Sequence, residues 1–325
     1  MSDLTYREAV AAALAAELAA DDRVVVIGED VGAAGGVFKA TAGLHERFGA
    51  DRVRDTPISE QAIVGCALGA AVMGLRPVAE IMFADFAGTC FDQIANQLAK
   101  FRYQSGGQAG APVTLRMASG ASVGFGAQHS QSVENWFLNV PGLKLALPST
   151  PADLYGLLRA AIQDEDPVIV FEHKALYALR GEVPDGDGSV PLGRAEVVRE
   201  GADVTVVAAQ LMRHRAVEAA EHLAAEGISC EVIDPRTVAP LDLDRILASV
   251  GKTGRLAVVQ EAPPAGSWGQ LVVAEATLRG FELLDAPPAL IAADPIPIPY
   301  AANLEDLTLP NVERIAAELR RLAEA

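Results

Sequence analysis

Short apolar runs recur along this chain of 325 residues, and a helical pattern separates most of them from the next run. Such alternation is typical of βαβ units, in which neighbouring strands run parallel and helices cover the sheet. The pattern lapses at 181–195, a stretch rich in Pro and Gly that reads as a linker. The sequence therefore predicts an α/β protein with two doubly wound domains, residues 1–180 and 196–325, on either side of that linker.

The expected elements follow from these runs. In the first domain we expect strands at Val24–Ile27, Val53–Ile58, Pro77–Phe83, Pro112–Met117, Leu143–Leu147 and Val168–Phe171, and helices over 1–20, from Glu60, over 89–102 and over 151–164. In the second we expect strands at Val204–Ala209, Ser229–Ile233, Leu256–Gln260 and Leu290–Ala293, and helices ending near Glu226, beginning near Asp242, and over 271–278 and 312–323. Ligands of doubly wound folds bind at the carboxyl ends of the strands, so we look there for candidate residues.

Composition excludes several classes of partner. The chain has 26 basic and 43 acidic residues, a formal net charge of −17, whereas nucleic acid and anionic membranes attract clustered Lys and Arg. Three cysteines without C-x-x-C spacing predict neither a disulfide framework nor a metal site. The N-terminus lacks the basic start of a signal peptide, and Gln61–Leu75, the longest uncharged stretch in a helical region, is too short to span a bilayer. We expect a cytoplasmic protein.

Acidic side chains directly follow two of the predicted strands. Glu29 comes after Val24–Ile27, and Glu60 comes after Val53–Ile58 at the start of a helix built from small residues. A first-turn carboxylate with Ser59 as N-cap is also an ordinary helix start, stabilised by ~0.3–1 kcal/mol through the helix dipole. The local pattern leaves both interpretations of Glu60 open, and it makes Glu29 a solvated loop acid by default.

Three further residues stand out less clearly. His129 ends a Gly- and Ser-rich loop, the kind of position where a general acid or base is often held. Asp92 lies on a predicted helix and is by default on its exposed face, and Phe86 is by default a core residue. The residues alone do not decide among these alternatives.

Three segments taken together resemble one family. They are Gly28–Gly32 with Gly35–Lys39, then Asp55–Gln61, then Ala127–Ser132 with Pro141–Lys144. In combination they are similar to the β subunit of the thiamine-diphosphate-dependent E1 component of 2-oxo acid dehydrogenase complexes, and the similarity runs from about residue 4 to the C-terminus. The resemblance implies a pyrimidine-binding domain followed by a transketolase C-terminal domain, and an α2β2 heterotetramer.

The resemblance also implies roles for the candidate residues. Thiamine becomes a nucleophile when its own 4′-imino group removes the C2 proton, and that imino form requires a carboxyl group sharing a proton with N1′. Glu60 matches the family glutamate in that role, and Phe86 matches the aromatic residue that packs against the aminopyrimidine ring. Glu29 and Asp92 match acidic positions of a proton route between two active sites. His129 matches the histidine that handles protons while the acyl group passes to lipoamide.

Metal sites follow from the same comparison. In the family, Mg²⁺ at the cofactor diphosphate is held by a Gly-Asp-Gly motif and by an Asn pair further along the chain. Gly186–Gly188 has the sequence Gly-Asp-Gly, but Asn is absent between Asn139 and Asn303, so this segment is not that motif. Mg²⁺ is therefore expected on a separate α chain. A structural potassium site in some relatives matches Val113, Ala161, Ile162, Asp164 and Asp166, largely through backbone carbonyls.

The sequence thus predicts an oxidoreductase subunit that is active only with α. We expect oxidative decarboxylation of a pyruvate-like 2-oxo acid and reductive acylation of the lipoyl groups of E2, with the acetoin-cleaving branch as an alternative. Half of a split transketolase-like enzyme is a second alternative, although the acidic balance offers few basic residues for a sugar phosphate. A non-catalytic scaffold that docks E2 is a third, and the presence of both Glu60 and His129 disfavours it.

Overall fold

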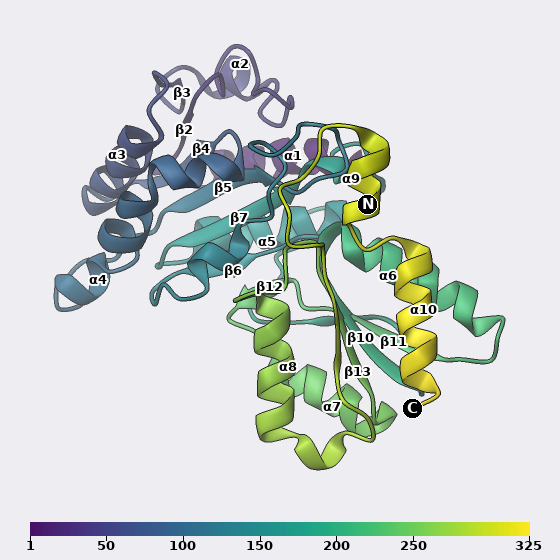
Figure 1. The fold of residues 1–325 in the computed structure, drawn as a ribbon. Helices are drawn as coiled ribbons and strands as arrows, with labels where there is room; N and C mark the ends of the chain where they lie inside the picture. The colour runs from purple at the N-terminus through teal and green to yellow at the C-terminus, as the bar shows by residue number, and fades with distance from the viewer. The chain divides into compact units, whose positions relative to one another are not determined.

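The computed structural model describes residues 1–325, which form two compact units (Figure 1). The first unit comprises Met1–Ser119 and Asn139–Leu192, and the second comprises Gly120–Leu138 and Gly193–Ala325. The units differ from the predicted domains in two places. Residues 120–138, expected in the first domain, group with the second unit, and residues 181–192 of the predicted linker group with the first.

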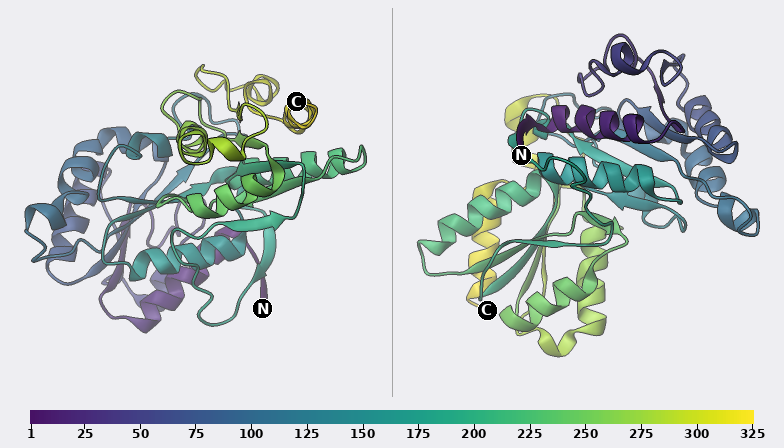
Figure 2. Two further views of the ribbon diagram at one scale, coloured as in Figure 1. Left: turned by 90° about the horizontal axis from the view of Figure 1, so that it is seen from below. Right: turned by 180° about the vertical axis from the view of Figure 1, so that it is seen from behind.

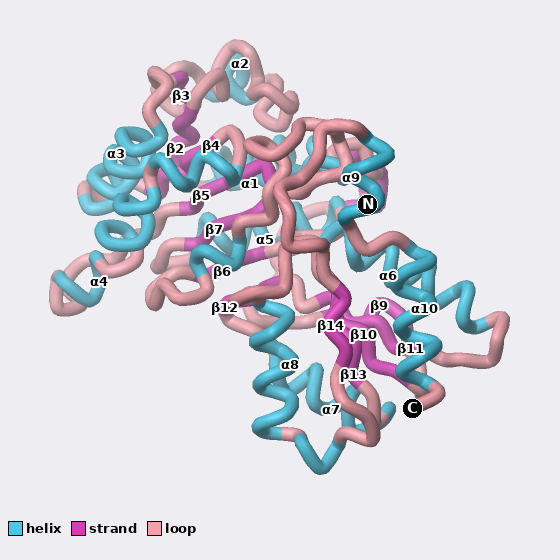
Figure 3. Tube along the Cα trace, viewed as in Figure 1, coloured by secondary structure: helices cyan, strands magenta, loops and turns pink.

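The first unit is built on a parallel sheet whose strands can be followed in Figure 3. Its strands are β2 (Val24–Gly28), β3 (Val53–Asp55), β4 (Arg76–Ile81), β5 (Thr114–Ser119), β6 (Lys144–Ala146) and β7 (Val168–His173). Within the unit they lie in the order β6-β7-β5-β4-β2-β3, and every pair is parallel. After β2 the chain goes to one side for β3 and to the other for β4, so the topological switch point lies at β2 and β4.

Helices cover both faces of this sheet. On one face α1 (Tyr6–Ala20) packs against α5 (Pro151–Gln163), and on the other α3 (Glu60–Val72) packs against η2 (Gln93–Leu98) and β4 (Figures 1 and 2). A capping box of Thr5 and Glu8 starts α1, and the Thr150 side chain caps α5. A five-residue helix, α2 (Leu44–Phe48), precedes β3.

Two predicted helices of this unit are wrong in part. The one expected over 89–102 is broken into the 3₁₀ turn η1 (Ala84–Thr89), the π-helical turn η2 and α4 (Phe101–Gln104). Gly88 and Thr89, both poor helix formers, interrupt its start, and at the π turn the Ala99 N–H donates to the Ile94 carbonyl, five residues back, at 3.0 Å. The N-terminal helix is preceded by β1 (Ser2–Thr5), which pairs antiparallel with β8 (Arg180–Val183), so the predicted linker begins as a strand.

The second unit holds a mixed sheet in the order β14-β13-β10-β11-β9, in which only β9 is antiparallel to its neighbour. The strands are β9 (Glu196–Arg199), β10 (Val204–Ala208), β11 (Cys230–Asp234), β13 (Leu256–Val259) and β14 (Ala289–Ile291), with a separate short strand β12 (Thr237–Ala239). The switch point of this sheet lies at β10 and β13.

Helices cover the second sheet on both faces too, α6 with α10 on one and α7 with α8 on the other (Figure 1). They span α6 (Gln210–Ala224), α7 (Leu243–Thr253), α8 (Trp268–Arg279), α9 (Ala302–Thr308) and α10 (Val312–Ala323). Small buried side chains, Ala216, Ala219 and Ala220, allow α6 to lie close to the strands. No helix of the chain is long and apolar enough to cross a membrane.

Candidate active site

Three of the predicted site residues gather at the carboxyl edge of the first sheet. Glu29 directly follows β2, Glu60 begins the helix that follows β3, and Phe86 lies in the turn after β4. These three strands are neighbours, and the switch point falls among them. All three side chains are half-buried, so they line the edge without being sealed in the core. This is the place where a doubly wound sheet binds its ligand.

Glu60 is held at the first turn of α3. The strand before it ends at Asp55, earlier than predicted, because Pro57 has no N–H for a sheet ladder. Ser59 occupies the N-cap position, but its side chain makes no capping hydrogen bond. The alternative that Ser59 and Glu60 form only an ordinary helix start is therefore less well supported. Glu60 Oε2 lies 3.2 Å from Thr89 Oγ1, whose hydroxyl is also 2.8 Å from the Phe86 carbonyl oxygen. Thr89 therefore joins the acid to the turn that carries Phe86.

The charges at this edge also affect one another. The pKa of Glu29 is raised, first by burial and then by the charges of Asp30 and Glu60. The pKa of the Cys90 thiol is raised to about 12 by burial, with a further contribution from Glu60. A negative charge on Glu60 is thus felt by two neighbours from different segments of the chain, and Cys90 stays a protonated, unreactive thiol at neutral pH.

The Phe86 ring belongs to a line of aromatic side chains. It meets Phe83 edge to face at 5.4 Å between ring centroids, Phe83 meets Phe38 at 5.5 Å, and Phe38 stacks on Tyr177 at 5.0 Å. Contacts of this kind contribute ~0.5–1.5 kcal/mol each beyond area burial. Because these neighbours are buried or packed on one another, the Phe86 ring is fixed in place while part of it remains exposed.

The loop that carries Glu29 is tied to β3. The Gly32 N–H donates to Asp55 Oδ1 at 2.6 Å, and a Cβ at Gly32 would clash with that carboxylate, at 2.5 Å from Oδ2. Asp55 thereby links the loops after the two neighbouring strands. Sequence reasoning missed the role of Asp55, because the predicted strand Val53–Ile58 placed this residue inside the strand, whereas the observed strand ends at it.

Asp92 makes no contact of this kind with Glu29 or Glu60. It is exposed, and its carboxylate accepts a hydrogen bond at 2.7 Å from Asn96 Nδ2, one turn further on. No hydrogen bond or ion pair joins it to Glu29 or Glu60. Its part in a proton route stays a prediction that the chain by itself does not support.

His129 belongs to the second unit. It is half-buried, and its backbone N–H donates to the Gly126 carbonyl at 3.3 Å. The neighbouring Ser130 hydroxyl is buried and makes no hydrogen bond within the chain. A cavity of about 550 Å³ adjoins this segment, lined by Ala127, Ser130–Val133, Trp136, Glu261, Pro263 and Pro295–Ile298. Glu261, another acid at the end of a predicted strand, was also missed from the sequence.

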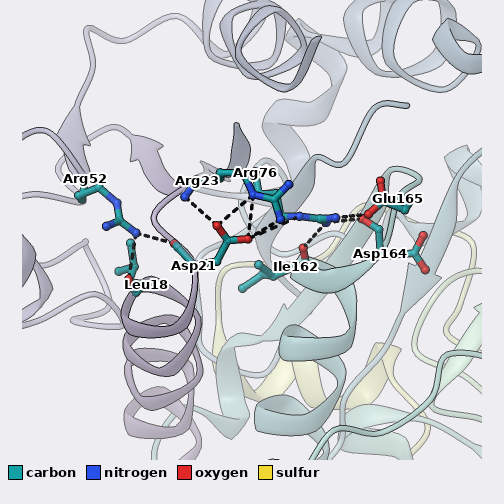
Figure 4. A network of polar contacts seen from close by, with 8 residues as sticks. All are labelled: Leu18, Asp21, Arg23, Arg52, Arg76, Ile162, Asp164 and Glu165. Atoms are coloured by element: carbon teal, nitrogen blue, oxygen red, sulfur yellow. Dashed lines mark hydrogen bonds and ion pairs between the residues drawn. The ribbon is translucent and has the colours of Figure 1, made fainter. Parts of the chain in front are cut away.

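The residues predicted to hold potassium do lie together, but their oxygens already accept hydrogen bonds from the chain. Arg76 Nη1 donates to the carbonyl oxygens of Ile162 and Asp164, each at 3.0 Å, while the same guanidinium pairs with Glu165 and faces Asp21 (Figure 4). Lys144 Nζ lies 2.6 Å from the Asp164 carboxylate.

The three remaining positions of the predicted potassium site are occupied in the same way. The carbonyls of Ala161 and Val113 accept from backbone N–H groups of Asp164 and Val168, and Arg102 pairs with Asp166 at 2.6 Å. No cluster of His, Cys, Asp or Glu in the chain could hold a metal ion. Three cationic side chains, Arg76, Lys144 and Arg102, lie on Asp164, Ile162 and Asp166, and potassium stays a prediction.

A buried charge network lies beneath the site. Arg116 on β5 forms a two-pronged pair with Glu172 on β7 (Nε–Oε1 2.6 Å, Nη2–Oε2 2.9 Å) and contacts Glu80 on β4 at 2.6 Å. The Tyr177 hydroxyl donates to Glu172 at 2.9 Å. Burial alone would lower the pKa of Arg116, but the two carboxylates outweigh it and raise that pKa. The pKa of Glu80 is raised by burial, which outweighs the guanidinium.

Comparison with known proteins agrees with this architecture. Residues 2–180 match the family described as "Transketolase, pyrimidine binding domain", and residues 193–315 match "Transketolase, C-terminal domain". A solved structure titled "Split gene transketolase, inactive beta4 tetramer" superposes with a TM-score of 0.81 over 99% of this chain and 98% of that chain, at 24% identity. Fold and site define the class: a two-domain α/β protein of the transketolase type.

Sequence relatives narrow the class. The chain is 48% identical to acetoin:2,6-dichlorophenolindophenol oxidoreductase subunit beta of Cupriavidus necator, over 98% of this chain and 97% of that protein. It is 47% identical to 2-oxoisovalerate dehydrogenase subunit beta and 44% identical to pyruvate dehydrogenase E1 component subunit beta, both of Bacillus subtilis and both over 100% of each chain. The chain belongs to the family of E1 β subunits of the thiamine-diphosphate-dependent 2-oxo acid dehydrogenases, oxidoreductases that work with an α subunit.

Proposed function

We propose that this chain, paired with an α subunit in an α2β2 heterotetramer in the cytoplasm, catalyses the oxidative decarboxylation of a pyruvate-like 2-oxo acid and the reductive acylation of a lipoyl group on E2. The observation that carries the proposal is the gathering of Glu60, Glu29 and Phe86 at the switch point of the first sheet. An acid beside a partly exposed, fixed aromatic ring suits a flat, basic heterocycle such as an aminopyrimidine.

Glu60 would hold a proton at N1′ of the aminopyrimidine, with Phe86 packed against the ring. When bound, thiamine diphosphate supplies the nucleophilic carbon that takes up the 2-oxo acid and releases CO₂. The diphosphate and its Mg²⁺ would be held by α, because the sequence of this chain lacks the Gly-Asp-Gly motif with its Asn pair. Glu29 would be the neighbouring acid through which protons reach Glu60.

His129 would serve the second half of the reaction. In that half the S–S bond of the lipoyl dithiolane breaks, one sulfur becomes bonded to the acyl group, and His129 would deliver a proton to the other sulfur. The half-buried imidazole of His129 carries a ring N–H that can deliver that proton. Charge and composition still argue against nucleic acid as a partner, since the chain carries a formal net charge of −17.

Reconstitution tests the proposal. The α chain encoded with this β chain would be combined with it, loaded with thiamine diphosphate and Mg²⁺, and assayed against pyruvate, branched-chain 2-oxo acids and acetoin. We expect CO₂ release from a small 2-oxo acid and acylation of an isolated lipoyl domain. Turnover of acetoin alone would favour the second candidate, which the relative of 48% identity supports. Turnover of none of these substrates would contradict the proposal.

A further inference from the structure

The segment that carries His129, Gly120–Leu138, has almost no regular structure of its own. Its one helical element is the 3₁₀ turn η3 (Glu134–Phe137). Four residues in its first part have left-handed backbone angles: Gly120 (φ 85°), Ser122 (67°), Gly124 (71°) and Gly126 (71°). Glycines are conformationally permissive and lose much entropy when ordered. Contacts with groups outside the segment therefore help to determine where His129 lies.

Glu305 on α9 is the first of these groups. It is buried, 3% exposed, and its two carboxylate oxygens accept hydrogen bonds from the backbone N–H groups of Ser122 (2.8 Å) and Gly124 (3.1 Å). N–H groups that converge around a left-handed residue form a concave anion site. Here the anion is a side chain of the protein itself, and each bond is a charge-assisted one.

Glu261, two residues beyond the end of β13, is the second group. Its Oε1 accepts hydrogen bonds from the Ala121 N–H at 2.6 Å and from Ser132 Oγ at 3.0 Å. These two donors lie on either side of His129 in the sequence, so one carboxylate joins both ends of the stretch that contains the imidazole. Ala121 is itself anchored in a small apolar cluster with Ala293, Ile298 and Leu309.

We infer that Glu261 and Glu305 are positioning residues for His129: two carboxylate clamps that set the imidazole in place for proton delivery to the lipoyl sulfur. The inference rests on the proposed function of His129. The charge matters as well as the packing, because each carboxylate accepts two donors and an alanine accepts none. Both carboxylates bind the segment that carries His129, so their removal should affect acyl transfer more than decarboxylation.

The test uses the reconstituted α/β enzyme with Glu305→Ala, Glu305→Gln, Glu261→Gln and His129→Ala. Two rates are compared, CO₂ release with an artificial electron acceptor and reductive acylation of a lipoyl domain. A displacement of ~1 Å at a catalytic group can lower a rate about a hundredfold, so for Glu305→Ala we expect acylation to fall at least tenfold more than CO₂ release. Gln keeps one acceptor, so Glu305→Gln should lie between Ala and wild type, with an unchanged KM for the 2-oxo acid.

Two further measurements distinguish a misplaced His129 from a general loss of folded structure. Hydrogen exchange of the Ser122 and Gly124 amides should quicken at least tenfold in Glu305→Ala while peptides of the first unit stay protected. In a His129→Ala background, adding Glu305→Ala should lower acylation no further, since the clamp acts through His129. The control is Glu282→Ala, an exposed acid of the same unit, for which both rates and exchange should equal wild type.

Each possible result decides the inference. If Glu305→Ala and Glu261→Gln leave the ratio of the two rates at the wild-type value, or if their losses multiply with that of His129→Ala, the clamps do not position His129. If Glu305→Ala fails to fold, the same comparison with Glu305→Gln and Glu261→Gln decides. If His129→Ala itself lowers both rates equally, the proposed role of His129 is wrong, whereas faster exchange at Ser122 and Gly124 would still demonstrate the clamp.

Discussion

Replacement of Arg116 by Met tests the buried network most sharply. Arg116 is 2% exposed and neutralises the carboxylates of buried Glu172 and half-buried Glu80, at 2.6 Å each. Met fills much of the same volume but leaves Glu172 and Glu80 facing one another without a cation. Removing one partner of a buried ion pair costs about 3–5 kcal/mol. With an m-value near 2 kcal/mol/M, the urea midpoint of the first unit should fall by about 1.5–2.5 M.

The pH dependence gives this prediction a second signature. The pKa of Glu80 is already raised in the folded protein, so its protonated form favours folding at acid pH and that contribution is lost as the pH rises through the raised pKa. Without Arg116 the pKa rises further, and the deficit of the variant should be smaller at pH 5.5 than at pH 8. Midpoints would be measured by urea titration at both pH values, with the β chain in its α/β complex.

A surface arginine provides the matched control for Arg116→Met. Arg23→Met removes a guanidinium whose side chain is 58% exposed and pairs with Asp21 at the surface, so its midpoint should stay near that of wild type. The double variant Arg116→Met/Glu172→Gln removes one of the two stranded charges and should recover part of the loss. A midpoint for Arg116→Met equal to that of Arg23→Met, or a deficit that grows toward acid pH, would refute the reasoning.

Further predictions concern pH, packing and the histidine. Burial, together with the charge of Glu261, raises the pKa of Glu134 to about 7. The protonated form favours folding below pH 4.5, and that contribution is lost as the pH rises through 7. Glu134→Gln should therefore raise the free energy of unfolding at pH 8 by up to about 3 kcal/mol, seen as a higher melting temperature, and leave it unchanged at pH 4.5. Equal effects at both pH values would contradict this. Gly142→Ala places a Cβ 2.0 Å from the Ala99 carbonyl oxygen, at a backbone φ of 101°. It should lower the urea midpoint far more than Gly107→Ala, because Gly107 has a similar φ of 78° but open space where its Cβ would lie. Similar urea midpoints for the two variants would be inconsistent with the clash. For His129→Ala we expect a greater loss in lipoyl acylation than in CO₂ release, measured in the two-rate assay, and equal losses would speak against its role.

The sequence predicted the fold well because apolar periodicity is a local property. Strands such as Val24–Ile27 and Val168–Phe171 are largely buried on both faces and form continuous apolar runs in the sequence, which predict them directly. Errors arose where tertiary contacts outweigh local preference. The pairing of Ser2–Thr5 with Arg180–Val183 joins residues far apart in the chain, and neither segment has a strong strand pattern.

The residues of the candidate site also differ in whether the sequence could predict them. Glu29 and Glu60 could be found because they follow strands, and the order of the strands then brings them together. Thr89, Asp55 and Glu305 could not be found, because their roles depend on backbone N–H groups and carbonyls contributed by distant segments. A carboxylate that clamps a loop looks, in the sequence, like any acid on a short helix.

The most direct test of the central claim is the rate of CO₂ release by the reconstituted α/β enzyme carrying Glu60→Gln. A glutamine keeps the size of the side chain and its hydrogen-bonding oxygen but cannot share a proton with N1′. General acid–base contributions are typically 10²–10⁴-fold, so we predict a fall in kcat of about a hundredfold or more, with thiamine diphosphate still bound. Decarboxylation near the wild-type rate would contradict the account, since Glu60 would then be only the first residue of α3.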